Sequence, residues 1–336
     1  MCSESGRLDD TTMEVENMTV MMSNLMKNLN NDVSVETLMK NFNNDISVEI
    51  FKYLDIFESS SAIDRFFEAW CKASQKDWQT LDFSMLKSDF IKTKVEPFVW
   101  VNHSFDNNLY NLLFAALNSS NGNIKSLIFH YNLFLTDDQF MYTAKRCPLV
   151  RRLVFVSWNR IKKISIRKAI RGWKDLESMT MPSIRDPKYV FEEISKNCKN
   201  FKELKIMGHL HMRFASALTM HLPNLEVLSI RCSCLDMKAL VLILDKLQHL
   251  QVLNISHSCF VKPGFSVYDR EGYMFINDID LSTIREKASR LCEFFLCEKQ
   301  TSCIMCHRTR DDCGFPRWFM YEEGIWKDDE VKSLAI

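Results

Sequence analysis

A short hydrophobic pattern, apolar-x-x-apolar-x-apolar, recurs six times through the middle of the chain. The starts of successive copies are separated by 26, 26, 25, 24 and 25 residues. The alternation that closes each copy is typical of a short strand with one buried face. A period this regular predicts a repeat protein rather than a set of unrelated strands. The six copies are Ile124-Leu127-Phe129, Val150-Leu153-Phe155, Leu176-Met179-Met181, Phe201-Leu204-Ile206, Leu225-Leu228-Ile230 and Leu250-Leu253-Ile255.

Helical patterns lie between these strands. Thr136 is a good N-cap for a helix that ends at Cys147, Pro187 opens a second helix, and Asp236 opens a third. A strand and a helix of this size cannot bury their apolar sides alone, so neighbouring units must stack. The sequence therefore predicts an α/β fold, a leucine-rich-repeat solenoid (a horseshoe with one strand and one helix per repeat) over residues 84–300.

A different, all-helical pattern precedes the repeats. Two apolar stripes at helical spacing are separated by three serines and predict a helical hairpin within residues 39–83. The stripes are Ile46, Ile50, Leu54 and Phe57, then Ile63, Phe66, Phe67 and Trp70. The segment from Trp78 to Phe83 has the apolar pattern of the repeats, so we expect it to be the strand that opens them.

This combination resembles the plant F-box/LRR-repeat proteins. The places of the F-box pattern are filled by Asp45-Ile46, Ile50-Phe51, Leu54, Trp70 and Trp78, and the junction to the repeats reads WQTLDFS. Segments such as TDDQF, RCPLVRRL, GWKDLESMTMPSI and LPNLEVLSIRCS are similar to the repeats of that group. The resemblance covers roughly residues 42–327. The chain departs from the family where its Leu-Pro pair is replaced by Phe42-Asn43.

The resemblance implies a non-catalytic substrate-recognition subunit of an SCF-type E3 ubiquitin ligase. Its F-box would dock a Skp-family adaptor, and through it a cullin, while the repeats bind an unknown target protein. The residues that it assigns to the adaptor interface are Phe42, Ile46, Ile50, Phe51, Leu54 and Trp70. The departures keep an alternative open, which is a leucine-rich-repeat interaction scaffold whose degenerate F-box no longer docks.

The N-terminal segment contains a near duplication of thirteen residues, Met26–Leu38 and Met39–Phe51. Only the second copy runs into the F-box helix. We therefore expect residues 1–38 to be a mobile tail and the first copy to be a remnant.

Charge and composition limit the cellular compartments and the partners that we expect for the protein. The 43 acidic and 43 basic side chains cancel, so no global field draws the chain to nucleic acid or to a membrane. Neither a signal peptide nor a spanning apolar run is recognisable, and the 12 cysteines are expected to be reduced thiols. These features favour the cytoplasm or the nucleus.

A basic stretch, WNRIKKISIRKAIRGW, interrupts the repeats between Val156 and Leu176. It predicts a helix that presents a solvated basic face, with an acidic partner or a phosphate as the alternative.

Thiols gather near the end of the chain, where Cys303 and Cys306 form a CxxC pair. A structural zinc site usually joins two such pairs, and only one is clear here. We therefore expect no cofactor and no metal, and treat the thiols as part of a segment that caps the last repeat over residues 301–336. If zinc is bound, the candidate ligands are Cys297, Cys303, Cys306 and His307. A metal-dependent enzyme is a third class, but no catalytic motif supports it.

Overall fold

The computed structural model describes residues 79–82, 110–129 without 112, 115 and 119, 135–155, 158, 161–262, 276, 280–298 and 300–311. These residues fall into two compact units, one with residues 110–120 and the other with residues 79–82 and 121–311. The first unit has helical residues between 110 and 118, where Leu113, Ala116 and Leu117 are fully buried. Within these ranges no helix combines the length and the apolar character needed to cross a bilayer.

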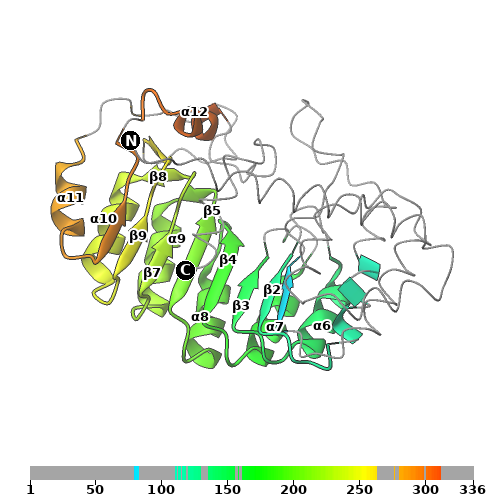
Figure 1. The fold of residues 1–336 in the computed structure, drawn as a ribbon. Helices are drawn as coiled ribbons and strands as arrows, with labels where there is room; N and C mark the ends of the chain where they lie inside the picture. The colour runs from blue at the N-terminus through cyan, green and yellow to red at the C-terminus, as the bar shows by residue number, and fades with distance from the viewer. Residues whose placement is uncertain are drawn as a thin grey trace, which may run out of the picture. The chain divides into compact units, whose positions relative to one another are not determined.

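The second unit is built on a parallel sheet of eight strands, so the expectation of an α/β fold is confirmed. Neighbours in the sheet follow the order of the chain, β1-β2-β3-β4-β5-β7-β9-β11 (Figure 1). The strands are β1 (Thr80–Asp82), β2 (Ser126–Ile128), β3 (Arg152–Val154), β4 (Ser178–Pro182), β5 (Glu203–Met207), β7 (Val227–Ser229), β9 (Val252–Asn254) and β11 (Glu293–Phe295).

The register of the sheet follows the hydrophobic pattern. Leu127, Leu153 and Met179 are opposite one another in β2, β3 and β4, and the alignment continues to Leu253 in β9. All eighteen side chains of the six predicted patterns are buried. The segment expected to open the repeats is β1, which pairs with β2 through Leu81 and Leu127.

One strand of the eight-stranded sheet, β11, was not predicted from the sequence. β11 pairs with β9 through Phe294 and Leu253, and it belongs to a seventh copy of the pattern, Leu291-Phe294-Leu296. The copy escaped notice because it begins 41 residues after Leu250 instead of about one repeat after it.

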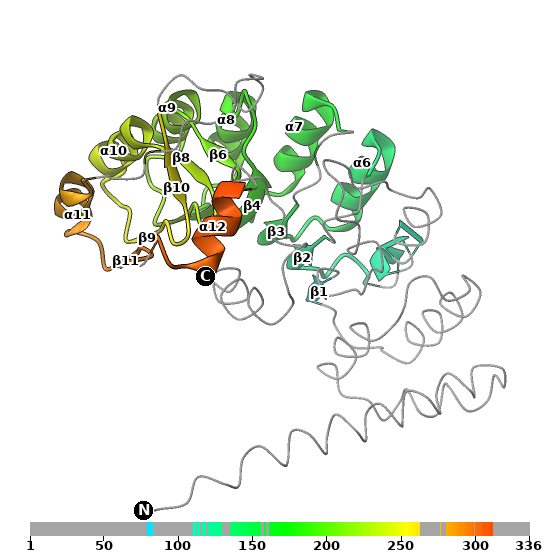
Figure 2. The ribbon, with the colours of Figure 1, turned by 90° about the horizontal axis from the view of Figure 1, so that it is seen from above.

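Helices follow the strands and pack in a row on one face of the sheet (Figure 2). They are α6 (Asp137–Arg146), α7 (Lys163–Gly172), α8 (Lys188–Asn197), α9 (Met212–His221), α10 (Met237–Lys246) and α11 (Ser282–Ala288). The three predicted helix starts are confirmed. Thr136 forms a capping box with Gln139, Pro187 is the N-cap of α8, and the Asp236 side chain accepts a hydrogen bond from the backbone N–H of Lys238.

Aromatic side chains fill the core between the sheet and the first helices. Phe140 of α6 stacks on Phe155 at a centroid distance of 5.0 Å and meets the edge of Trp173 at 5.8 Å. The indole N–H of Trp173, which is fully buried, donates a hydrogen bond of 2.9 Å to the carbonyl oxygen of Cys147. The end of one helix is thus tied to the end of the next.

A second, three-stranded sheet lies beyond the carboxyl ends of the strands. Its strands, β6 (His209–Leu210), β8 (Cys234–Asp236) and β10 (Cys259–Val261), follow β5, β7 and β9 and also pair in parallel. Each is reached through a residue with positive φ at the same place in its repeat, Gly208, Cys232 or His257. Such a backbone favours glycine, so the cysteine and the histidine there are unusual.

The last helix of the described chain, α12 (Ile304–Asp311), packs against β10 and lies apart from the row of α6 to α11 (Figure 2). Its Thr309 hydrogen-bonds with the thiol of Cys232 in the loop after β7. Met305, Cys306 and Thr309 form its buried side. α12 therefore sits over the loops at the carboxyl end of the sheet.

Candidate functional site: the open sheet face and a thiol–imidazole cluster

The residues assigned to the adaptor interface lie outside the part of the chain that the structure describes. Phe42, Ile46, Ile50, Phe51, Leu54 and Trp70 therefore remain predictions, as does the mobile tail over residues 1–38. Two features within the described ranges carry functional chemistry. One is the face of the sheet opposite the helices, and the other is a cluster of thiols and an imidazole near α12.

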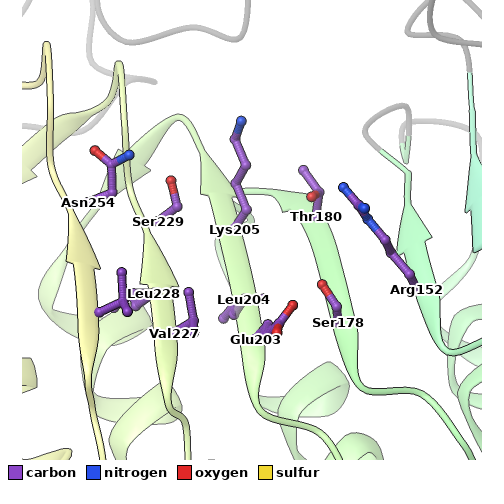
Figure 3. A pocket seen from close by; sticks show the side chains of 11 residues that line it. Arg152, Ser178, Thr180, Glu203, Leu204, Lys205, Val227, Leu228, Ser229 and Asn254 are labelled. Carbon is purple, nitrogen blue, oxygen red and sulfur yellow. The ribbon is translucent and has the colours of Figure 1, made fainter. Parts of the chain in front are cut away.

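Side chains on the face opposite the helices form two rows, because alternate residues of each strand point away from the core. The first open row is Thr80, Ser126, Arg152, Ser178, Glu203, Val227, Val252 and Glu293. The second row is Ile128, Val154, Thr180, Lys205, Ser229, Asn254 and Phe295. Figure 3 shows parts of both, with Thr180, Lys205 and Ser229 above Ser178, Glu203 and Val227.

The two rows differ in exposure. The side chains of the first row from Ser126 to Val252 are partly exposed, and Glu293 is exposed. The second row is buried from Ile128 to Ser229. Lys205 is the one buried lysine of the described chain, and burial together with the charge of Arg231 lowers its pKa to about 7. The first open row is therefore the surface that can reach a partner.

The hollow between the two rows is shallow. It is lined by Arg152, Glu203, Lys205, Val227 and their neighbours, and its cavity volume is about 10 Å³, roughly the room that one water needs. Pockets for small molecules are far larger. The described part of this face is thus suited to a macromolecular surface rather than to a small ligand.

The basic stretch predicted from the sequence contains α7, and three charges of that helix are paired within the protein. The carboxylate of Glu193 on α8 accepts hydrogen bonds from Arg167 at 2.7 Å and from Arg171 at 2.8 Å, and Lys163 meets Asp186 at 2.8 Å. Hydrogen bonds from Arg171 lower the pKa of Glu193 to about 2 against the opposing effect of burial. The basic side chains remain partly solvated, as the sequence predicts, and they also join α7 to the next unit.

The second feature is a cluster of four possible ligands, His257, Cys297, Cys303 and Cys306. Their ligand atoms all lie within 4.8 Å of one another. The Nδ1 atom of His257 is 3.3 Å from the sulfur of Cys303 and 3.7 Å from the sulfur of Cys306. Three of the four candidates from the sequence are thus together.

The imidazole of the cluster is not the one that the spacing suggested. The Nε2 atom of His307 lies 2.7 Å from the carbonyl oxygen of Thr301, and His307 is exposed. His257 takes its place from a turn after β9. No local sequence signal points to His257, which has a positive φ like Gly208 and Cys232 at the same place in earlier units.

Cys303 and Cys306 stand at the start of α12, where backbone N–H groups are available to a sulfur. Burial raises the pKa of the Cys303 thiol, but hydrogen bonds from the backbone of Cys306, the thiol of Cys297 and the backbone of Met305 shift it below its ordinary value. Such N–H donors stabilise a thiolate, which is the form that binds metals.

The fold defines a class, that of α/β proteins whose parallel sheet is compatible with a solenoid of strand–helix repeats, and the comparisons give the family. An F-box/LRR-repeat protein from Arabidopsis thaliana is 49% identical over 289 residues, which are 85% of this chain and 93% of that protein. The chain therefore belongs to the plant F-box/LRR-repeat proteins. A putative F-box protein from the same plant is 23% identical over 323 residues, covering 85% of this chain and 93% of the relative.

No model of a known protein family matches the chain. A mandelate racemase/muconate lactonizing enzyme from Jannaschia sp. CCS1 shares 7% identity, covering 60% of this chain and 52% of its own, with a TM-score of 0.23. That score is too low to indicate a common fold.

Proposed function

We propose that this protein is a non-catalytic substrate-recognition subunit of an SCF-type E3 ubiquitin ligase. The observation that carries the proposal is the 49% identity to an F-box/LRR-repeat protein along nearly the whole length of that relative. The helices within residues 39–83 form the F-box and dock a Skp-family adaptor, which connects the protein to a cullin. The strand–helix units form a leucine-rich-repeat solenoid that binds the target protein.

The open sheet face supports the proposal that the repeats bind the target protein. The first open row offers a guanidinium at Arg152, carboxylates at Glu203 and Glu293, and apolar contacts at Val227 and Val252. Apolar contacts framed by charges are what a protein interface uses for affinity and specificity. The transfer of ubiquitin belongs to other subunits, so this chain contributes by holding its target in position. The same proposal puts the protein in the cytoplasm or the nucleus.

Adaptor capture tests the proposal. Full-length protein is co-expressed with a Skp-family adaptor, and the complex is measured by affinity purification and titration. Ile50→Asp with Leu54→Asp places two charges in an apolar interface, where an unpaired charge costs on the order of 3–5 kcal/mol. Binding should weaken at least about 100-fold. Lys52→Asp is the matched control, because helical spacing puts residue 52 on the opposite side of the same helix.

The outcomes of this experiment distinguish the ligase subunit from the leucine-rich-repeat scaffold. Capture by the unaltered chain and by Lys52→Asp, with loss in the double variant, supports the ligase subunit. If the unaltered chain captures no Skp-family adaptor, the ligase proposal is wrong and a leucine-rich-repeat scaffold with a non-docking F-box takes its place.

A further inference from the structure

We propose that His257, Cys297, Cys303 and Cys306 bind one Zn²⁺ ion, which fastens the C-terminal helix α12 to the carboxyl end of the repeat sheet. Neither the family nor the proposed ligase function assigns a metal to these residues. The site rests on its own geometry, and it would exist in a ligase subunit and in a scaffold alike.

The distances agree with a tetrahedral zinc ion. Zinc lies about 2.3 Å from a thiolate sulfur and about 2.0–2.1 Å from an imidazole nitrogen, so sulfur and nitrogen on one ion are about 3.6 Å apart and two sulfurs about 3.8 Å. Here the nitrogen of His257 is 3.3 Å from the sulfur of Cys303 and 3.7 Å from that of Cys306, and all four ligand atoms lie within 4.8 Å of one another. The separations of up to 4.8 Å exceed the tetrahedral sulfur–sulfur distance by at most about 1 Å, which rotation of the side chains can close.

The donor set selects zinc and a structural role. Three thiols and an imidazole form one of the standard structural zinc sites, and soft sulfur ligands disfavour magnesium and calcium. Four protein ligands fill the tetrahedron, so no position remains for a water or a substrate. Binding converts up to three thiols to thiolates and releases their protons to solvent.

The backbone at His257 is a second, independent observation. Its φ of 58° is left-handed; at the same place in earlier units Gly208 has a φ of 117° and Cys232 a φ of 53°. A histidine pays a conformational cost there that glycine does not. The turn directs the imidazole at Cys303 and Cys306, so the side chain has a use that offsets this cost.

The ligands come from separate parts of the fold. His257 follows β9, Cys297 follows β11, and Cys303 and Cys306 belong to the start of α12. His257 and Cys303 are 46 residues apart in the sequence. A metal that closes such a loop restricts the unfolded chain and fixes the last helix on the end of the sheet.

The test measures zinc in the full-length protein after purification without chelator. We expect about one zinc per chain by elemental mass spectrometry. Cobalt exchanged into the protein should give the strong visible bands of tetrahedral thiolate coordination. Chelation should lower the melting temperature and speed amide exchange in α12.

Matched variants distinguish this site from chance binding. His257→Asn keeps a residue that tolerates the left-handed turn, and it should weaken zinc binding more than about 10-fold. His307→Asn removes the other nearby imidazole, and Cys292→Ser removes an exposed thiol outside the cluster. Both should keep a full equivalent of zinc.

Three results would overturn the proposal. The first is an unaltered chain that holds no zinc and gives no tetrahedral cobalt spectrum when metal is supplied. The second is His257→Asn with unchanged zinc affinity. The third is a protein mass two hydrogens low with Cys303 and Cys306 joined, which would make the pair a disulfide. The cobalt spectrum of the unaltered chain decides the matter even if a variant fails to fold.

Discussion

Arg171 of α7 holds the carboxylate of Glu193 on α8 with two parallel hydrogen bonds, each 2.8 Å long. Arg167 adds a third at 2.7 Å, and the Glu193 side chain is only 2% exposed. Bidentate pairs of this kind are stronger than single contacts between exposed charges. The relationship ties two consecutive repeats together on their helical side.

Glu193→Gln should lower the free energy of unfolding by about 2 kcal/mol at pH 7, because two guanidinium groups lose their buried anion. The pKa of Glu193 is about 2 in the folded protein against an ordinary 4.5. Its contribution is therefore complete above about pH 4.5 and disappears as the pH falls toward 2. Denaturant unfolding at several pH values should show the two proteins converging in acid.

The neighbouring Glu192 provides the control for this pair. It meets Lys196 at 2.7 Å on the exposed side of α8, and such pairs contribute little. Glu192→Gln should unfold like the unaltered chain at every pH. A Glu193→Gln protein that is as stable as this control would show that the arginines do not depend on the carboxylate.

Trp173→Phe tests the bond between successive helix ends. The indole N–H that reaches the Cys147 carbonyl is lost, and a buried acceptor without a donor costs about 1–3 kcal/mol. Trp173→Ala adds a cavity and should cost about 3–5 kcal/mol. Calorimetry should rank the two in this order, with the exposed Met220→Ala unchanged. If Trp173→Phe is as stable as the unaltered chain, the hydrogen bond to Cys147 does not contribute to stability.

Val227→Lys with Val252→Lys tests the open face as the target-binding surface. Both valines lie in the first open row and are partly exposed, so the protein should keep its fold and its melting temperature within a few degrees. Targets identified by proximity labelling with the unaltered chain should no longer be captured. Met220→Lys is the control, because Met220 lies on a helix and is 70% exposed. This variant should still capture the targets. Undiminished capture by the double variant would move the target site elsewhere.

Removal of residues 1–38 tests the interpretation of the duplicated segment. The first copy has no helix to continue into, so truncation should leave both the melting temperature and adaptor capture unchanged. A fall in melting temperature of several degrees would mean that the segment packs on the folded protein.

The repeat could be predicted because its chemistry is local. Leu127, Leu153 and Leu228 each follow an apolar residue by three positions, and each is buried in register with the others. β11 broke the period because residues 262–280 come between Phe260 and the next unit. The position of Phe294 in the sheet was thus invisible to a search for even spacing.

The thiol–imidazole cluster could be predicted only in part, because its ligands are far apart in the sequence. Cys303 and Cys306 could be found by their spacing, but their partner His257 comes from a turn one repeat earlier. Sequence distance favoured His307, which is adjacent to Cys306, although a helix points adjacent side chains about 100° apart. The ion pairs of α7 were missed for a related reason, because Glu193 approaches Arg171 only when two units stack.

Pairing between consecutive units also predicts the order in which the strands of the sheet form during folding. From β2 to β9 each strand finds its partner 24–26 residues away, so contacts are short in sequence and assembly can spread from any starting pair. The ends are different: 46 residues separate Leu81 from Leu127, and 41 separate Leu253 from Phe294. Closing these longer loops costs more chain entropy, so β1 and β11 should join last and open first.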